Sequence, residues 1–290
     1  FYAETLPNPY LRVFPIKEVS DIGRKHNIPL IMDNTAAPVI CKPLDHGAAV
    51  VVHSLTKFIG GHGTVIGGCL VDGGNFDWTA DPKRQPLYNE PDMSYGGAKW
   101  GEVVPQLTGA NVSFAVRARV CLLRDLGAPL APDNAWGIIQ GLETAPLRMK
   151  QHCSNAEKAV DFLKKHKNVT RVIYPTLHEG EIAARSKKYL KGGNGALVGI
   201  EVKGGVEAGK KFIESLKMFY HVANIGDARS LAIHPATTTH SQLTEEELLA
   251  AGVTPGYVRL SIGIEHPDDI VGDLDQALNE SGKPGLKAVS

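Results

Sequence analysis

The hydrophobic pattern in the first part of the chain predicts an alternation of helices and short buried strands. Residues 15–26 place apolar side chains three residues apart on one face, behind a proline in the first turn, which is typical of an amphipathic helix. Short runs that are apolar throughout predict strands buried on both faces; they cover residues 29–32, 48–52 and 67–71. This alternation predicts an α/β fold with a mostly parallel sheet and flanking helices.

The middle of the chain loses this regularity. Residues 73–100 are rich in Gly, Pro, Asn, Asp and Tyr without a clear period, which predicts a long irregular surface insertion. A helical pattern resumes near residue 112 and, after a break at 127–132, continues over 138–165.

The last part of the chain predicts a second, smaller α+β domain. Thr244 and Glu247 form a capping box for a short helix, and Pro267 with two aspartates opens a final helix. The remaining elements are strands at 171–174, 196–202 and 257–265 and a helix at 206–217. We therefore predict a large domain over residues 1–135 and a small C-terminal domain over residues 136–290.

Composition narrows the classes of partner. The 290 residues carry 31 basic and 31 acidic side chains, a balance that favours a small metabolite over nucleic acid or a membrane surface. Four widely spaced cysteines argue against a zinc site and predict free thiols in a reducing compartment, so we expect a cytoplasmic protein. The opening residues lack an initiator methionine and read as part of a strand, so we expect the later portion of a longer chain.

Lys57 is the first candidate for chemistry. It follows the predicted strand 48–52 at once and lies between two hydroxyl residues and the glycine-rich turn 60–63. Strand ends carry the functional groups of α/β sheets. A lysine held there in a buried setting can act as an amine nucleophile and form a Schiff base. The alternative is an ordinary lysine whose ammonium group leaves the fold at the end of the strand.

Asp33 and the hydroxyl residues Ser54 and Thr56 are the next candidates. Asp33 ends the strand before the one that leads to Lys57, so in a parallel sheet both side chains emerge at one edge. A carboxylate there can keep a pyridine nitrogen protonated, although an Asp-Asn turn or a helix cap fits equally. The two hydroxyls suit a phosphate group, or merely bond within the turn.

Two features of the last domain could bind a substrate. Arg259 lies inside an alternating strand, where it either faces solvent or grips a carboxylate with its planar fork. Residues 226–241 form a dense polar run between apolar strands, which predicts a segment outside the core.

These motifs resemble the Cys/Met-metabolism group of fold-type I enzymes that use pyridoxal 5′-phosphate (PLP), over nearly the whole chain. The resemblance rests on Asp33-Asn34-Thr35, His53-Ser54-Leu55-Thr56-Lys57, Gly60-Gly61-His62-Gly63 and the insertion 75–100 with Tyr95-Gly96-Gly97. The signature Asn224-Ile225-Gly226-Asp227-Ala228-Arg229-Ser230-Leu231, with His234-Pro235 and Thr237-Thr238-Thr239-His240-Ser241-Gln242-Leu243, is similar to the O-acetylhomoserine sulfhydrylase branch.

The resemblance implies a role for each candidate. Lys57 would bind PLP covalently and shuttle protons, Asp33 would pair with the pyridinium nitrogen, and the hydroxyls of Ser54 and Thr56 would contact the phosphate. Substrate carboxylate binding would fall to Arg259, helped by Ser230 and Asn8.

The resemblance also implies an activity and its rivals. The expected reaction is γ-replacement on O-acetyl-L-homoserine with sulfide, giving L-homocysteine and acetate, in a homo-oligomer (a dimer of dimers) with shared active sites. Cystathionine γ-synthase or γ-lyase chemistry is one alternative. A non-catalytic chain that supports a partner is another, because the family's N-terminal part has no match here and independent activity would need it. A Rossmann dehydrogenase is disfavoured, because no Gly-x-Gly-x-x-Gly follows a first strand.

Overall fold

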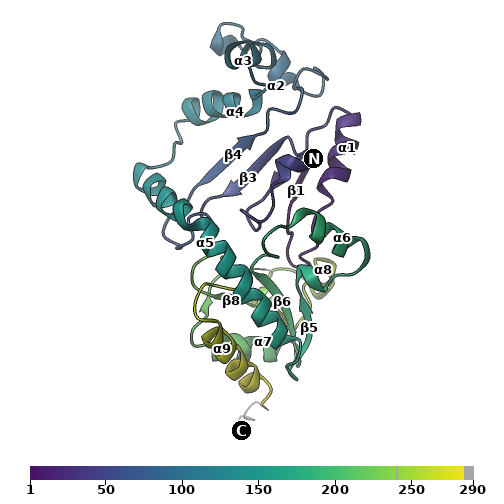
Figure 1. The fold of residues 1–290 in the computed structure, drawn as a ribbon, viewed down its shortest axis with the longest axis vertical. Helices are drawn as coiled ribbons and strands as arrows, with labels where there is room; N and C mark the ends of the chain where they lie inside the picture. The colour runs from purple at the N-terminus through teal and green to yellow at the C-terminus, as the bar shows by residue number, and fades with distance from the viewer. Residues whose placement is uncertain (240, 284–290) are drawn as a thin grey trace.

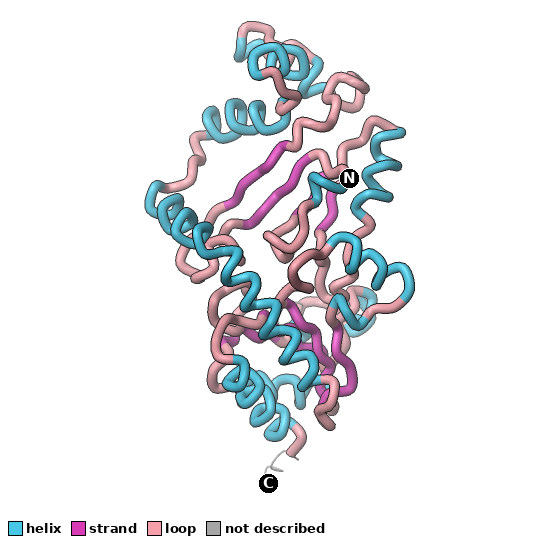
Figure 2. Tube along the Cα trace, viewed as in Figure 1, coloured by secondary structure: helices cyan, strands magenta, loops and turns pink. Residues whose placement is uncertain are grey.

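A computed structural model describes residues 1–239 and 241–283 of the chain, and it contains two β-sheets joined by one long helix (Figure 1). His240 of the polar signature therefore lies outside the described residues. Figure 2 shows strands in two separate groups along the length of the molecule, with helices around each group. Within the described residues, no helix has the length and apolar character needed to cross a membrane.

The first sheet has four strands in the order β1-β2-β3-β4. Its strands are β1 (Tyr2–Glu4), β2 (Ile31–Asp33), β3 (Val50–Ser54) and β4 (Gly68–Asp72). The first three are parallel, whereas β4 runs antiparallel to β3. The α/β class and the mostly parallel sheet are thus confirmed, and β2, β3 and β4 each begin within two residues of the predicted start.

Helices and tight turns cover this sheet and extend beyond it. The predicted amphipathic helix is α1 (Ile16–Lys25), whose Ile16 is fully buried. Beyond the sheet follow α2 (Pro86–Asn89), α3 (Trp100–Thr108), α4 (Ser113–Arg117) and a π-helical turn (Ala118–Arg124).

The segment 73–100 is more structured than its sequence predicts. Phe76, Trp78, Tyr88 and Trp100 form an aromatic cluster that packs with Ala49 and Val50 at the start of β3. The rest of the segment is mostly irregular and lies at the surface, as expected, so the prediction missed the buried aromatic side chains. These aromatic side chains have no regular spacing along the chain, so the sequence pattern does not predict their burial. They become buried only when the segment packs against the start of β3.

The second sheet has five strands in the order β5-β6-β9-β8-β7. Its strands are β5 (Val169–Ile173), β6 (Leu197–Val202), β7 (Tyr220–His221), β8 (Leu231–Ile233) and β9 (Tyr257–Ser261). It packs against α7 (Gly205–Ser215) and α9 (Pro267–Ser281), and α6 (Gly180–Tyr189) and α8 (Glu245–Ala250) lie beside it (Figure 1). The capping box of Thr244 and Glu247 is present at α8.

The polar run 226–241 contributes to the core, contrary to expectation. Its middle forms the fully buried strand β8, and Ser230 and His234 are 0% and 1% exposed. His234 Nε2 lies 2.9 Å from the Pro255 carbonyl, so its polar atom is satisfied inside the fold. The prediction failed because these polar groups bond to backbone and side-chain groups inside the fold rather than to solvent.

Helix α5 (Pro132–Leu163) runs from beside the first sheet to the second sheet (Figure 1). Its C-terminal part, including Ala156, Ala159 and Leu163, is buried in the core of the second sheet. The two sheets lie on either side of residue 136, while the helix itself continues across that point. The division into domains 1–135 and 136–290 stays a prediction.

Candidate active site

The carboxyl ends of two neighbouring parallel strands bring Asp33 and Lys57 to one pocket. Asp33 is the last residue of β2, and Lys57 follows the last residue of β3 by three positions. The pocket has a volume of about 210 Å³. It is lined by Glu4, Leu6, Asn8, Asp33, Thr35, Ala36, Ser54, Lys57, Leu197 and Ile225, which come from both halves of the chain.

Lys57 is half-buried, and its amine bonds a side chain of the 224–231 segment. Lys57 Nζ donates a hydrogen bond to the Asn224 side-chain oxygen. Burial lowers the pKa of Lys57, and the positive charge of Arg259 lowers it further. Both effects favour the neutral amine, which is the form that can attack a carbonyl or accept a proton.

Asp33 is held at the strand end by two hydrogen bonds. Its Oδ1 accepts from the Thr35 backbone N–H at 2.9 Å, and its Oδ2 accepts from the Tyr2 hydroxyl at 3.1 Å. The turn bond to Thr35 was the alternative role for this residue, and the structure shows it together with a place in the pocket. Each carboxylate oxygen retains a further lone pair for a ligand.

Ser54 and Thr56 occupy different places. Ser54 lines the pocket, and its backbone N–H donates to the Thr35 hydroxyl at 2.8 Å, which ties the ends of β2 and β3 together. The Thr56 hydroxyl instead bonds the Gly67 backbone, accepting from its N–H at 3.1 Å and donating to its carbonyl at 3.3 Å. Thr56 is not among the residues that line the pocket.

Arg259 approaches the pocket from β9, next to Asn8. Its Nη1 lies 3.5 Å from the Asn8 side-chain oxygen, and its Nη2 donates to the Asn224 backbone carbonyl at 3.2 Å. Burial lowers the pKa of Arg259. The guanidinium is thus turned toward the same segment that contacts Lys57, and not away into solvent.

Ser230 does not reach this pocket. It is fully buried, its hydroxyl donates to Glu265 Oε2 at 2.9 Å, and its Oγ accepts from the Gly263 backbone N–H at 2.9 Å. Its bonds instead hold β8 to the chain just beyond β9.

Three residues of the site were not selected from the sequence. Asn224 accepts from Lys57, Glu4 lines the pocket, and Thr35 bridges the two strand ends. Asn224 stands at the start of the 224–231 signature and Thr35 within the Asp33 motif, so a closer reading of each motif could have found both. Glu4 has no comparable signal.

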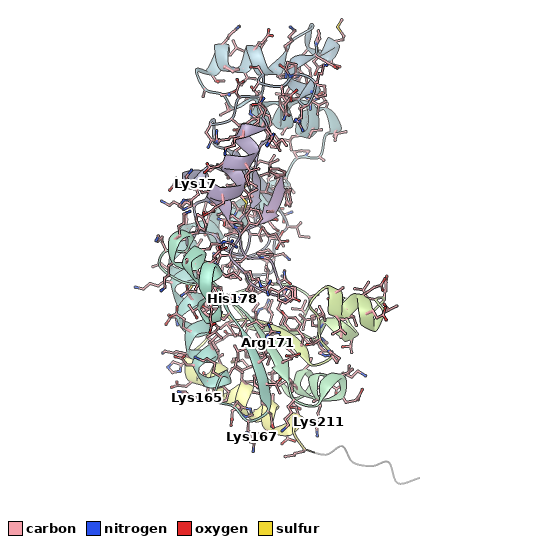
Figure 3. All side chains as sticks on the ribbon, turned by 90° about the vertical axis from the view of Figure 1, so that its right-hand side faces the viewer. Lys17, Lys165, Lys167, Arg171, His178 and Lys211 are labelled. Carbon is pink, nitrogen blue, oxygen red and sulfur yellow. The ribbon has the colours of Figure 1, made fainter. Side chains whose placement is uncertain are left out.

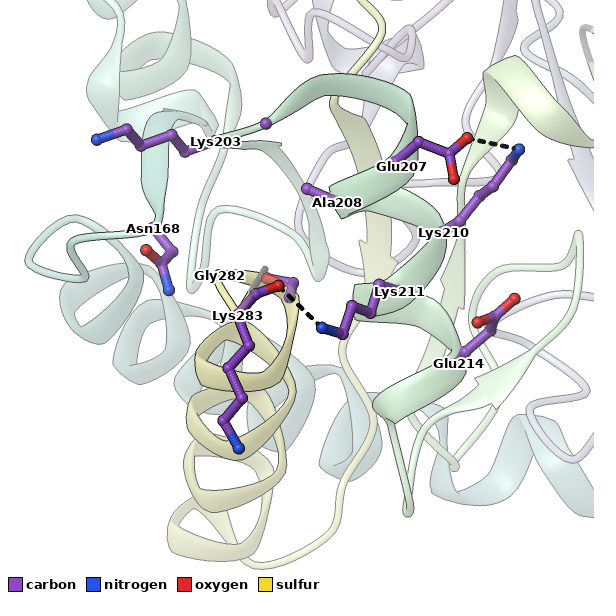
Figure 4. A pocket seen from close by; sticks show the side chains of 11 residues that line it. Asn168, Lys203, Glu207, Ala208, Lys210, Lys211, Glu214, Gly282 and Lys283 are labelled. Carbon is purple, nitrogen blue, oxygen red and sulfur yellow. Dashed lines mark hydrogen bonds and ion pairs between the residues drawn. The ribbon is translucent and has the colours of Figure 1, made fainter. Parts of the chain in front are cut away.

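A larger cavity lies elsewhere in the structure. It measures about 720 Å³ and opens between α7 and the end of α9, where Lys203, Lys211 and Lys283 line it (Figure 4). Figure 3 places Lys165, Lys167 and Lys211 at the same end of the molecule, away from Lys17 on α1. Glu207 and Glu214 also line it, and none of the predicted site residues does. Size alone therefore does not locate the chemistry.

The donor set of the Lys57 pocket fits a PLP-type cofactor. An amine of lowered pKa, a carboxylate and a hydroxyl converge there from adjacent strand ends, as an aldehyde, a pyridine nitrogen and a phosphate require. This combination on a mostly parallel sheet is typical of α/β enzymes that hold PLP through a lysine.

Comparison with known proteins specifies the family. The sequence model of the Cys/Met metabolism PLP-dependent enzyme family matches residues 1–279, and the chain belongs to this family. O-acetyl-L-homoserine sulfhydrylase of Leptospira meyeri is 53% identical over 283 residues, covering 96% of this chain and 64% of that protein. Homocysteine synthase of Schizosaccharomyces pombe is 43% identical, with 96% and 64% covered.

Solved structures agree with the fold. The crystal structure of a putative O-acetylhomoserine (thiol)-lyase from Campylobacter jejuni, which contains N′-pyridoxyl-lysine-5′-monophosphate, matches with a TM-score of 0.87 and 40% identity. That match covers 96% of this chain and 65% of the other. Cystathionine γ-synthase of Xanthomonas oryzae matches with a TM-score of 0.75 and 31% identity, covering 97% and 62%. The fold-type I expectation is confirmed, and the chain spans 64% of the length of the curated relatives described above.

Proposed function

We propose that the whole protein catalyses γ-replacement on O-acetyl-L-homoserine with sulfide, yielding L-homocysteine and acetate. One observation carries the proposal: Lys57 and Asp33 leave neighbouring parallel strands into one pocket, and the pKa of Lys57 is lowered there. The names of the relatives from Leptospira meyeri and Campylobacter jejuni support O-acetylhomoserine as the substrate.

The residues of the pocket divide the work by their chemistry. PLP, when bound, supplies a ring that withdraws electrons and stabilises negative charge at the substrate carbons. Lys57 would hold the cofactor and, as a neutral amine, remove the Cα proton of the substrate. Asp33 would keep a proton on the ring nitrogen. Ser54 would bond the phosphate directly, whereas Thr56 would shape the turn through Gly67.

Arg259 and Asn8 form the proposed site for the substrate carboxylate. The Arg259 guanidinium presents a planar fork beside the Asn8 amide, an arrangement that suits bidentate binding. Ser230 would act only indirectly, through its bonds to Glu265 and Gly263. The proposed substrates are thus an acylated amino acid and a small thiol.

The pocket formed by this chain is small for a cofactor and substrate together. Its 210 Å³ lies below the roughly 300–1,000 Å³ of typical small-molecule sites. The proposed activity therefore refers to the whole protein. The relative from Leptospira meyeri is longer than this chain, which spans 64% of its length. Whether the chain alone binds PLP is tested by adding PLP and recording a saturable visible absorbance band.

Lys57→Ala in the whole protein tests the proposal. We expect turnover of O-acetyl-L-homoserine and sulfide to fall by about 10²–10⁴-fold or more, because the variant loses both the covalent anchor and the base. Lys17→Ala is the matched control, since Lys17 pairs with Asp21 on the surface of α1. Near-normal turnover by Lys57→Ala, with an unchanged cofactor band, would refute the assignment. Cysteine as the better acceptor would point to cystathionine γ-synthase chemistry instead.

We also propose that the protein works as a homo-oligomer. The N-terminal half of α5 exposes Trp136, Ile139, Leu142 and Leu147, which are 68%, 55%, 54% and 72% exposed. Contiguous apolar side chains on a surface commonly mark a contact between proteins. Light scattering of the whole protein would give its mass, and a monomer would contradict the proposal. The cytoplasmic location stays a prediction.

A further inference from the structure

We propose that Arg148 is a positioning residue for Lys57. Its guanidinium holds the backbone that directly follows Lys57 against helix α5, so that the amine keeps its direction into the pocket. The inference rests on the proposed function only in taking Lys57 as the reacting amine.

Arg148 contacts the loop through both terminal nitrogens. Nη1 donates to the Phe58 carbonyl at 2.6 Å, and Nη2 donates to the Ile59 carbonyl at 2.9 Å. Two further bonds, from Nη2 to the Gly141 carbonyl at 2.6 Å and from Nε to the Thr144 hydroxyl at 3.1 Å, fix the guanidinium to its own helix. The side chain thus joins α5 to the two residues after Lys57.

The guanidinium is buried without a carboxylate partner. Arg148 is 5% exposed, and within residues 1–239 and 241–283 no Asp or Glu forms an ion pair with it. An uncompensated buried charge is unfavourable, so carbonyl dipoles of two separate segments must satisfy it. A lysine ammonium cannot span these acceptors as a planar fork does, which explains why this position holds arginine.

The two carbonyls that Arg148 bonds would lack a partner from the regular secondary structure. Phe58 and Ile59 are buried, and their carbonyls need partners that no helix or sheet supplies. At Gly61, which has φ +70°, a Cβ atom would lie 2.1 Å from Arg148 Nη1, so a side chain there would displace the guanidinium. On the other side, the Ala228 N–H donates to the Gly61 carbonyl at 2.8 Å. The loop is therefore held between α5 and the 224–231 segment.

The same face of α5 also holds the chain beyond Arg259. His152 Nδ1 lies 2.7 Å from the Ile262 carbonyl, and Asn155 Nδ2 donates to the Gly263 carbonyl at 3.1 Å. With Arg148, these residues stand at spacings of four and three on one face of the helix. Helix α5 thus fixes the backbone after Lys57 and the backbone after Arg259 relative to each other.

Arg148→Lys in the whole protein tests the inference, with Arg185→Lys as control because Arg185 pairs with Glu181 on α6. In cofactor-free protein we expect the amides of Gly60 and Gly61 to exchange hydrogen about tenfold faster. In the loaded enzyme we expect kcat to fall about tenfold or more with KM changed less than about threefold, because the amine is misdirected while Arg259 is retained. Arg185→Lys should match the wild type in both.

A lowered melting temperature with loop exchange and kcat within about threefold of wild type would overturn the inference, since a purely structural role predicts that result. If Arg148→Lys does not fold, Thr144→Val removes the Nε acceptor, together with the 3.4 Å bond from the Thr144 hydroxyl to the Gly141 carbonyl, and must still accelerate exchange at Gly60 and Gly61; unchanged exchange would overturn the inference. Exchange needs no turnover, so a wild type inactive with sulfide would refute the proposed function alone.

Discussion

The lowered pKa of Lys57 is a property of its surroundings and not of its position in the sequence. Burial removes water from the ammonium, and Arg259 places a second positive charge nearby. The two causes come from different parts of the chain, because Lys57 follows β3 and Arg259 lies in β9. Arg259, the residue proposed to bind the substrate carboxylate, would therefore also help to keep the Lys57 amine neutral.

Arg259→Met should raise the pKa of Lys57, because it removes a positive charge that favours the neutral amine. Only the neutral amine reacts with PLP, so the rate at which the cofactor-free protein forms a visible absorbance band reports the fraction of neutral Lys57. In Arg259→Met, the acidic limb of the pH profile of this rate should therefore move to higher pH. Arg185→Met, on the surface of α6, should leave the limb in place. A limb that stays or moves to lower pH in Arg259→Met would contradict the proposed coupling.

At the scale of elements, contacts between helices remote in sequence hold the first sheet to the second. Glu18 on α1 accepts from the Tyr189 hydroxyl of α6 at 2.6 Å and pairs with Lys188 at 2.9 Å. The Tyr189 hydrogen bond, and then the Lys188 pair, lower the pKa of Glu18 to about 2. Tyr189 is itself buried, so the partly exposed Glu18 carboxylate fixes the position of a side chain in the core.

Glu18→Gln should lower the free energy of unfolding at pH 7 by up to about 1 kcal/mol, because half-exposed pairs are screened by solvent. The folded pKa lies below the unfolded value near 4.5, so this stabilisation is present above pH 4.5 and is lost as the pH falls toward about 2. Urea unfolding of both proteins at pH 7, 5 and 3.5 checks this. A difference that grows on acidification would contradict it.

At the scale of the molecule, α5 connects the two cores. Its buried polar residues bond both the loop after Lys57 and the chain after β9, and His152 stands between these contacts with its ring edge against Phe58. Burial lowers the pKa of His152 to about 4, so the ring is neutral in the native protein near neutral pH. The geometry of the site and the packing of the two cores thus depend on the same helix.

The whole protein should lose stability as the pH falls from 6.5 toward about 4, because the unfolded His152 binds a proton that the folded one resists. The full shift corresponds to a contribution on the order of 3 kcal/mol. His152→Gln should be less stable at pH 7, yet its stability should depend less on pH across this window. Thermal melts from pH 7.5 to 4.5 measure both slopes, and parallel slopes would disprove the role of His152.

The local sequence pattern predicted the helices and strands that have a regular apolar period. It missed the elements that are buried by contacts with distant parts of the chain. The strands that end at Asp33 and Ser54 and the helix from Ile16 follow from apolar periodicity, which is a property of neighbouring residues. The aromatic cluster around Trp78 and the buried strand β8 have no such period. Their burial depends on partners elsewhere in the chain.

The sequence by itself determined that Asp33 ends one short apolar strand and that Lys57 follows the next, because both facts depend on local spacing. Only the tertiary structure decided which groups meet them. Asn224 lies 167 positions from Lys57, and Arg148 lies 90 positions from Phe58. Such contacts depend on how α5, β9 and the 224–231 segment pack on one another, and packing of distant segments leaves no periodic trace in the sequence.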